Sequence, residues 1–344
     1  MTRLLLAALL TLAALPARAA TAEDFYRGRQ MTMWLSADAG GGYASYALAF
    51  APHFAAHIPG RPHIVVQYMP GAGGLRAMNF LYTNAEKDGS VIGLVHSSVP
   101  FAPLYGLAAA RYDPRRINWI GSINATNGIC VAWHESGVRT WDDLFSKEYF
   151  VGGTGAGSQM ETLPLILNKL FGTNIKIISG YQGGNDVYVA MERGEVDGRC
   201  GGLVSSISST RPDWFPEGKV YVPVQIAMER DPMFPDAPAI GELAKDELTR
   251  QVVRLILAPM DMDRPVLAPP GVPAERVSAL RAAFHAAMND PAFLADAARM
   301  KLEIKEVDGA AIERIFAAAY AMPPEVIRTA NEAMNLTGGT GGGN

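Results

Sequence analysis

The feature that most constrains the fold is a recurring unit: an apolar, strand-like run, a glycine-rich turn, and then usually a helix-like run. The turns are GGG at 40–42, PGAGG at 70–74, GGTGAGS at 152–158 and YQGGN at 181–185. Alternating strand-like and helix-like segments predict an α/β fold with mostly parallel strands. Ligands of such folds bind beyond the carboxyl ends of the strands, which is where these turns would lie.

The periodicity of apolar residues predicts the individual elements. Strands are predicted at 31–37, 63–69, 91–97, 127–133, 149–153, 174–180, 196–202, 220–228 and 252–260. Helices are predicted at 43–58, 75–85, 140–146, 161–171 and 186–195, with two more inside 269–300. The pattern restarts after Ile123, which indicates two α/β lobes rather than one.

The chain is therefore divided into two predicted lobes, each with its own sheet. The predicted boundaries are 28–123 plus 250–335 for the first lobe, 124–230 for the second, 231–249 for a crossover connection and 337–344 for a disordered glycine-rich tail. A length of 344 residues, 49% of them hydrophobic, is enough for two hydrophobic cores.

Residues 1–19 have the features of a secretory signal peptide. Arg3 precedes an apolar run from Leu4 to Leu15, and Ala17-Arg18-Ala19 provides small residues for cleavage. The apolar run is shorter than the ~20 residues that a membrane-spanning helix needs. We therefore expect cleavage and export to the periplasm rather than a membrane anchor.

The net charge and the two cysteines give further information about the class of protein. The net charge of −4 lacks the basic excess of a nucleic-acid-binding protein. Cys130 and Cys200 both lie in strand-like runs, and in an oxidising compartment such a pair can form a disulfide. The sequence leaves two alternatives open, a disulfide or two buried thiols.

The turn at 152–158 does not match a nucleotide site. Its glycines at 153, 155 and 157 are one residue short of G-x-G-x-x-G, and no carboxylate ends the next strand. No lysine follows the glycines, as a P-loop would require. We expect no nucleotide cofactor. Either the glycines serve only as tight turns, or the helix N-termini behind them hold an anion with their free N–H groups.

Three stretches together resemble the extracytoplasmic binding proteins of tripartite tricarboxylate transporters, the Bug-type family. They are 57–95 with its PGAGG turn, 180–200 with GYQGGND, and 268–300 with APPGVPAERV. The similarity runs from about Met31 to Ile315. It implies a two-lobed, Venus-flytrap protein that captures a small organic acid in the periplasm and delivers it to a membrane permease. The ligand would be a di- or tricarboxylate or an aromatic carboxylate.

The resemblance also implies where the ligand binds. The corresponding loops are 36–45, 96–98, 154–158 and 181–186. The candidate ligand-binding residues are Gly42, Tyr43, Ser45, Ser97, Ser98, Thr154, Gly155, Ser158, Tyr181, Gly184 and Asn185. The family often has an aspartate near its first glycine pair, where this chain has Ala44. The missing carboxylate leaves the ligand class open and makes an amine-bearing ligand less expected.

Other groups of residues in the sequence do not match a catalytic motif. His53 and His57 have helical spacing but lack the glutamate of a zinc peptidase, and no G-x-S-x-G motif occurs. We expect no cofactor, no metal and no enzymatic activity, in a monomer. Two alternatives remain, an exported enzyme on a two-lobed scaffold and a ligand sensor for a two-component system.

The anion-binding interpretation predicts the effect of a charge at Ser158. Ser158→Asp should abolish binding of organic acids, because the added carboxylate repels the ligand. The fold should survive, since aspartate is tolerated at the start of a helix. Calorimetric titration with acids would measure the affinity, and circular dichroism would check the fold. Unchanged affinity would contradict this placement of Ser158.

Overall fold

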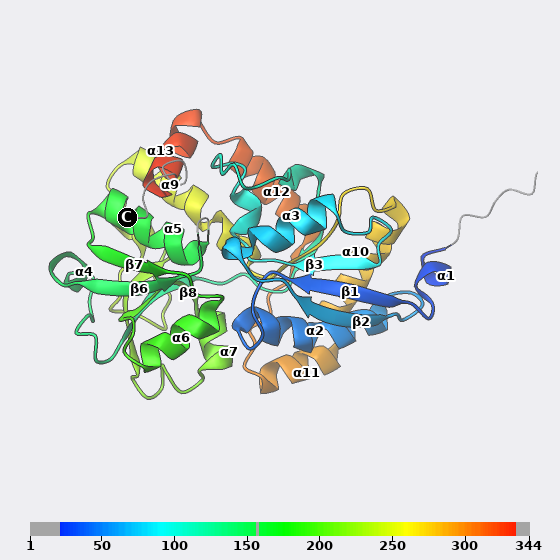
Figure 1. Ribbon diagram of the computed structural model, residues 1–344, viewed down its shortest axis with the longest axis horizontal. Helices are drawn as coiled ribbons and strands as arrows, with labels where there is room; N and C mark the ends of the chain where they lie inside the picture. The colour runs from blue at the N-terminus through cyan, green and yellow to red at the C-terminus, as the bar shows by residue number, and fades with distance from the viewer. Residues whose placement is uncertain (1–20, 156–157, 335–344) are drawn as a thin grey trace, which may run out of the picture.

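The computed structural model describes residues 21–155 and 158–334, and it forms two α/β lobes (Figure 1). The expected signal peptide at 1–19 and the expected tail at 337–344 lie outside the described residues. Within the described part, no helix combines the length and the apolar character needed to cross a bilayer.

Lobe 1 is built on a six-stranded sheet with the order β11-β4-β10-β3-β1-β2. Its strands are β1 (Gln30–Leu35), β2 (His63–Tyr68), β3 (Val91–Leu94), β4 (Asn118–Ser122), β10 (Pro265–Ala268) and β11 (Val307–Asp308). Its helices are α1 (Ala22–Tyr26), α2 (Gly42–His57), α3 (Leu75–Thr83), α10 (Ala274–Met288), α11 (Pro291–Arg299) and α12 (Gly309–Tyr320), with short 3₁₀ turns at Ala72–Gly74, Val99–Phe101 and Pro114–Arg116.

Lobe 2 is built on a five-stranded sheet with the order β7-β6-β8-β5-β9. Its strands are β5 (Gly128–Trp133), β6 (Tyr149–Gly153), β7 (Ile175–Ser179), β8 (Gly198–Leu203) and β9 (Val220–Ile226). Its helices are α4 (Asp143–Ser146), α5 (Gln159–Ile166) with a π-helical turn at Leu167–Phe171, α6 (Gly184–Glu192), α7 (Val204–Thr210), α8 (Ile240–Leu243) and α9 (Glu247–Leu257), followed by a 3₁₀ turn at Ala258–Met262.

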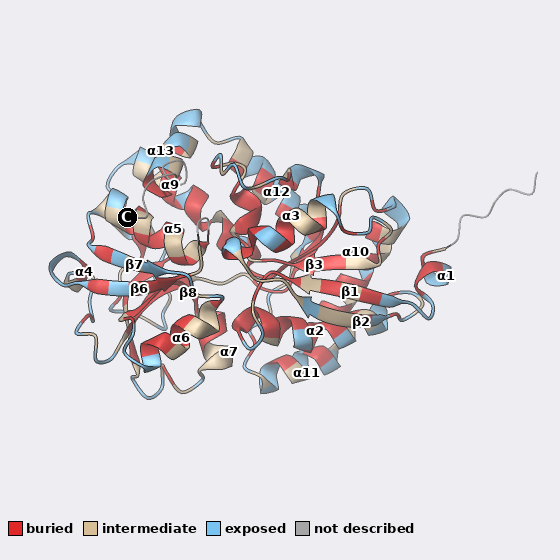
Figure 2. Cartoon of the chain, in the orientation of Figure 1, coloured by how far each residue is buried: buried red, intermediate tan, exposed pale blue. Residues whose placement is uncertain are grey.

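The hydrophobic core lies on both faces of each sheet. In lobe 1, an aromatic group of Phe50, Phe54, Phe284 and Phe293 packs α2, α10 and α11 against one face. Helices α3 and α12 cover the opposite face. Figure 2 shows the strands at the centre of the molecule buried and the outer faces of the helices exposed. This layering leaves the carboxyl ends of β1, β3 and β6 directed at the gap between the lobes.

The lobe boundaries differ from those expected from the sequence. Residues 231–249 do not cross between lobes, because α8 packs against β9 and α9. The chain returns to lobe 1 only after the turn at Ala258–Met262, where β10 begins. At the end of the described chain, α13 (Pro324–Met334) crosses again and packs on α5 and α9 (Figure 1). Part of 250–335 therefore lies with lobe 2.

The two sheets are mixed rather than mostly parallel. Strand β1 is parallel to β2 and β3, and β6 is parallel to β7 and β8, as the strand–turn–helix units predict. The antiparallel pairs involve β10 and β11 in lobe 1 and β5 with its neighbours in lobe 2. Strand β4 leaves lobe 1 and β10 returns beside it, so these two must run in opposite directions.

The segment 252–260, predicted as a strand, is the end of α9 and the 3₁₀ turn after it. Asp246 caps this helix by accepting a hydrogen bond from the Thr249 N–H at 2.8 Å. In α9, Glu247, Leu248 and Arg254 are exposed. The buried residues of this helix are Val252, Val253, Leu255, Ile256 and Leu257. A short apolar run does not by itself distinguish a strand from a buried helix.

Two crossing segments lie side by side between the lobes and form the hinge. The N–H of Ile123 donates to the Arg264 carbonyl at 3.2 Å, and the N–H of Asp263 donates to the Asn124 carbonyl at 2.9 Å. The Arg264 N–H also donates to Ser122 Oγ at 2.9 Å. These bonds fix the two crossings relative to each other, as neighbouring strands are fixed in a sheet.

A fully buried ion pair lies in this hinge. The side chains of Asp263 and Arg264 are 0% exposed and contact each other. The Arg264 guanidinium lies 4.1 Å from the ring of Tyr43 and 4.6 Å from the ring of Tyr46, both on α2 of lobe 1. It also donates to Ser206 Oγ, on α7 of lobe 2, at 2.8 Å. The pair therefore links the hinge to both lobes.

Cys130 and Cys200 form a disulfide inside lobe 2. They are directly paired on the neighbouring strands β5 and β8, and both are fully buried. Of the two alternatives that the sequence left open, the structure has the disulfide.

Replacing both cysteines with serine should lower the stability of lobe 2. The disulfide joins residues 70 apart in sequence, and closing a loop of this size contributes about 2–4 kcal/mol to the free energy of unfolding. Thermal unfolding would show the loss as a lower melting temperature. Reductant should lower the melting temperature of the unaltered protein and leave that of the double variant unchanged. Equal sensitivity of both proteins to reductant would contradict a disulfide.

Candidate functional site

A cavity lies between the two lobes, at the point where the sequence placed the glycine turns. It encloses about 570 Å³ of space between atoms, part of it open to solvent. Lobe 1 contributes the loop after β1, the start of α2 and the loop after β3. Lobe 2 contributes the turn after β6, the starts of α5 and α6, β8 and α7. We call this space the polar chamber.

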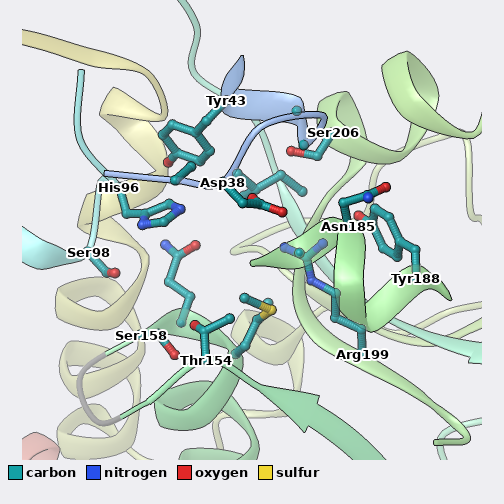
Figure 3. Close-up of a pocket in the computed structure, with 18 residues that line it drawn as sticks. Asp38, Tyr43, His96, Ser98, Thr154, Ser158, Asn185, Tyr188, Arg199 and Ser206 are labelled. Carbon is teal, nitrogen blue, oxygen red and sulfur yellow. The ribbon is translucent and has the colours of Figure 1, made fainter. Parts of the chain in front are cut away.

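Seven of the eleven candidate residues line the polar chamber. They are Gly42, Tyr43, Ser98, Thr154, Ser158, Gly184 and Asn185. Figure 3 shows Tyr43 and Ser98 on one side, with Thr154, Ser158 and Asn185 on the other. The structure thus brings together residues that are more than 100 positions apart in the chain.

The other four candidates do not line the chamber. Ser45 donates to the Gly41 carbonyl one turn back, at 3.4 Å. The Ser97 side chain is buried, while its N–H donates to the hydroxyl of Tyr43. The Gly155 N–H donates to Glu161 Oε1 at 2.7 Å, and the Tyr181 side chain packs on the core of lobe 2.

Arg199 is the strongest electrostatic feature of the polar chamber. Its side chain extends from β8 into the chamber (Figure 3), yet the residue is only 7% exposed. Within the described part of the chain, no carboxylate lies within 4 Å of its guanidinium, and its Nε has no hydrogen-bond partner. Its main contact is the ring of Tyr188 at 4.8 Å. Buried arginines are otherwise almost always paired, so this one is suited to bind an anion.

Further unpaired polar atoms surround the guanidinium. Among the described residues, four more buried atoms that line the chamber have no hydrogen-bond partner: Thr154 Oγ1, Ser158 Oγ, Gln159 Nε2 and the Tyr188 hydroxyl. An unpaired buried polar atom costs about 1–3 kcal/mol, and native structures contain few of them. Their concentration in one chamber indicates that a polar ligand completes the hydrogen bonding.

Three helices begin at the chamber and add to its positive potential. Helices α2, α5 and α6 start at Gly42, Gln159 and Gly184, which all line it. At none of the three does the N-cap residue donate or accept a side-chain capping bond. Their first N–H groups therefore remain available, together with the positive end of each helix dipole.

Glycine is required where the two lobes come closest. A Cβ on Gly42 would lie 2.5 Å from Ser206 Oγ, on α7 of the opposite lobe. A Cβ on Gly184 would lie 2.5 Å from Nη1 of Arg199. The first glycine allows α2 and α7 to approach, and the second leaves room for the guanidinium at the start of α6.

Asp38 faces Arg199 from the opposite lobe (Figure 3). Burial raises the pKa of Asp38, and the charge of Asp186 raises it further, whereas that of Arg199 lowers it. The sequence suggested that a carboxylate was missing because Ala44 stands where the family often has aspartate. Asp38 places a carboxyl group in the chamber from a different position.

His96 is neutral at physiological pH. Burial, together with the charges of Arg264 and Arg199, lowers the pKa of His96 to about 4. Its Nδ1 lies 3.2 Å from Ser36 Oγ, and its ring meets the ring of Tyr43 edge-on. Its position at the chamber wall allows the neutral ring to donate or accept a hydrogen bond there.

Sequence reasoning did not identify Arg199, Asp38 or Tyr188. Asp38 and His96 lie inside the loops 36–45 and 96–98 that the resemblance indicated, so only their individual roles were missed. Arg199 was assigned to a predicted strand at 196–202. The available signal was a charged residue between a glycine and a cysteine in a strand that is otherwise buried.

The two histidines with helical spacing are not at the chamber. His53 Nε2 lies 3.0 Å from Asp296, and His57 Nε2 lies 2.8 Å from Asp290. Both pairs connect α2 to the neighbourhood of α11 on the outside of lobe 1. No group of three or more potential metal-ligating side chains was found among the described residues.

Comparisons with known proteins agree with this architecture. The model of the family described as "Tripartite tricarboxylate transporter family receptor" matches residues 54–331. No curated protein matches the sequence. Among solved structures, the periplasmic binding protein BugD is 19% identical with a TM-score of 0.71, over 90% of this chain and 98% of its own.

Two further structures contain carboxylates. MatC from Rhodopseudomonas palustris, with bound malate, is 19% identical with a TM-score of 0.68, over 87% of this chain and 99% of its own. Another R. palustris protein, with adipate, is 18% identical with a TM-score of 0.69, over 88% of this chain and 97% of its own. At these identities the likeness shows the fold, that of two-lobed periplasmic binding proteins.

The lowered pKa of His96 predicts how stability depends on pH. The folded pKa is about 4 and the ordinary value is 6.5, so the unfolded chain takes up a proton in this window that the folded chain does not. His96 thus contributes stability that is present above pH 6.5 and lost as the pH falls toward 4, by up to about 1.4 kcal/mol per pH unit. His96→Asn should make the decline of melting temperature between these pH values shallower.

Comparing the pH dependence of melting temperature between variants separates the effect of His96 from that of other groups that titrate between pH 4 and 6.5. Burial raises the pKa of Asp263 to about 6, so its protonation acts in the opposite direction in all variants alike. His285→Asn is the matched control, because the ring of His285 is 73% exposed. A decline in His96→Asn as steep as in the unaltered protein would contradict the lowered pKa of His96.

Proposed function

Because the chain belongs to the receptor family of tripartite tricarboxylate transporters, we propose that it is a periplasmic solute-binding protein for a small organic acid. In this proposal it binds the acid between its two lobes as a monomer. It then delivers the acid to the membrane subunits of a tripartite transporter. It needs no cofactor and catalyses no reaction.

The observation that carries this proposal is the unpaired, buried guanidinium of Arg199. Burying a charge without a partner is costly, and an anionic ligand removes that cost. A carboxylate suits the site because a guanidinium can donate to both of its oxygens. The unpaired hydroxyls of Thr154 and Ser158 and the starts of α5 and α6 supply further donors on the same lobe. The malate and adipate bound by the two R. palustris proteins support a carboxylate.

Ligand capture would proceed by closure of the lobes. Arg199 and Ser158 belong to lobe 2, whereas Tyr43, His96 and Ser98 belong to lobe 1. A ligand that contacts both sets stabilises the closed arrangement by its differential affinity for that state. Closure also removes water from the guanidinium, which strengthens the ion pair with the acid.

The pair of Ser36 and His96 beside the chamber does not support a hydrolytic role. Ser36 Oγ accepts the N–H of His96 at 2.8 Å and also contacts its Nδ1. Ser36 is 1% exposed and does not line the chamber, so no substrate could reach its hydroxyl. The pair is better explained as a support that orients the imidazole ring.

The proposal predicts that Arg199→Gln weakens acid binding about 10- to 100-fold or more, the usual value of a hydrogen-bonded charge contact. The protein would be unfolded and refolded to remove bound ligand, then titrated calorimetrically with malate, adipate, hexanoate and phenylacetate. Arg193→Gln is the matched control, since Arg193 is exposed on the outer surface of lobe 2. Equal loss in both variants would contradict a direct role of Arg199.

Failure of every acid to bind the unaltered protein would overturn the proposal itself. Transport is tested separately. Loss of uptake of the bound acid in a strain that lacks this protein, restored by the unaltered chain and not by Arg199→Gln, would support delivery to a permease. Normal uptake without the protein would contradict delivery.

A further inference from the structure

A second cavity adjoins the polar chamber and has the opposite chemistry. It holds about 400 Å³ of space between atoms, part of it open to solvent. Its apolar wall consists mainly of Ala102, Leu163, Ile166, Ile256, Pro259 and Met334. Among the described residues, no Asp, Glu, Lys, Arg or His lines it. We call this space the apolar chamber.

The two chambers share two wall residues. Ser98 of lobe 1 and Gln159 of lobe 2 line both of them. Gln159 is the first residue of α5, and its Nε2 has no partner. A molecule with its polar end at Arg199 would have to pass between these two side chains to reach the apolar chamber.

The apolar chamber is enclosed by parts of both lobes. Ala102 and Tyr105 come from lobe 1, Leu163 and Ile166 from α5, and Ile256 from α9. The last wall is Met334 at the end of α13, the helix that crosses from lobe 1 to lobe 2. An apolar group in this chamber would thus contact both lobes.

Resting on the proposed function, we propose that the ligand is an amphipathic monocarboxylic acid with an alkyl or aryl tail. Its carboxylate binds at Arg199 and its tail occupies the apolar chamber. A second carboxylate at the far end of the tail would find no cationic partner among the lining residues, and burying it there is costly. In the polar chamber, a second carboxylate would meet Asp38.

The first test is a comparison of mono- and dicarboxylic acids of equal carbon number. Butanoate, hexanoate and octanoate are titrated calorimetrically beside succinate, adipate and suberate. Each methylene buried from water should tighten the dissociation constant by about fourfold until the chamber is filled. Hexanoate should bind more tightly than adipate, and octanoate more tightly than suberate.

The second test changes the size of the apolar chamber. Ala102→Leu fills part of it and should weaken octanoate at least tenfold while leaving butanoate within about twofold. Met334→Ala enlarges it and should move the preferred chain length upward. Ala108→Leu is the matched control, because Ala108 is exposed and lies outside the chamber. If Ala102→Leu fails to fold, the chain-length preference of Met334→Ala provides the test instead.

The outcomes separate this inference from the proposed function. If short acids bind but added methylenes bring no gain, or if adipate binds as tightly as hexanoate, the amphipathic ligand is refuted and acid binding stands. Equal weakening of butanoate and octanoate by Ala102→Leu would also refute it. If no acid of either series binds, the proposed function fails and this inference fails with it.

Discussion

The buried ion pair of Asp263 and Arg264 is the interaction on which the arrangement of the two lobes depends. Two charges at 0% exposure are costly to bury, and such a pair adds little net stability by itself. Residues of both lobes, however, contact the guanidinium of Arg264. They are Tyr43 and Tyr46 on α2, through their rings, and Ser206 on α7, through a hydrogen bond. Removing either lobe from this contact would leave the guanidinium with fewer partners. The pair therefore favours one relative position of the lobes over others.

The hinge and the binding cleft are parts of one packed unit. Tyr43 donates its hydroxyl to the Asp263 carbonyl at 2.7 Å, and the same residue lines the polar chamber. Ser206 accepts from Arg264 and lines the chamber opposite Gly42. A change in the angle between the lobes must therefore move the chamber walls. This coupling is what a receptor that closes on its ligand requires, because contacts in the cleft and contacts in the hinge then bias the same equilibrium.

Seven of the candidate residues line one chamber, whereas the predicted lobe boundaries differ from the course of the chain. Glycine turns after strands are local signals, and Gly42, Thr154, Ser158 and Gly184 line the chamber where those turns lie. Arg199 was missed because burial of a charged strand residue depends on neighbours that are distant in sequence. The helix at 247–257 was misassigned because the prediction began at its apolar second half, 252–260, and its N-cap, Asp246, was not recognised. The crossing of α13 could not be predicted, because the sequence shows that one face of this helix is apolar but not that the face packs on α5 and α9.

Because α13 lies on lobe 2, the movement of the two lobes could be measured from labels on the first and last described helices. Helix α1 lies on lobe 1, at the far end from the cleft, whereas α13 lies on lobe 2 (Figure 1). The first and last described helices are therefore carried by different halves of the protein. A pair of fluorescent labels, one on each helix, would change their energy transfer whenever the angle between the halves changes. The chain thus provides attachment points for an optical sensor of lobe closure, without any label near the residues that line the polar chamber.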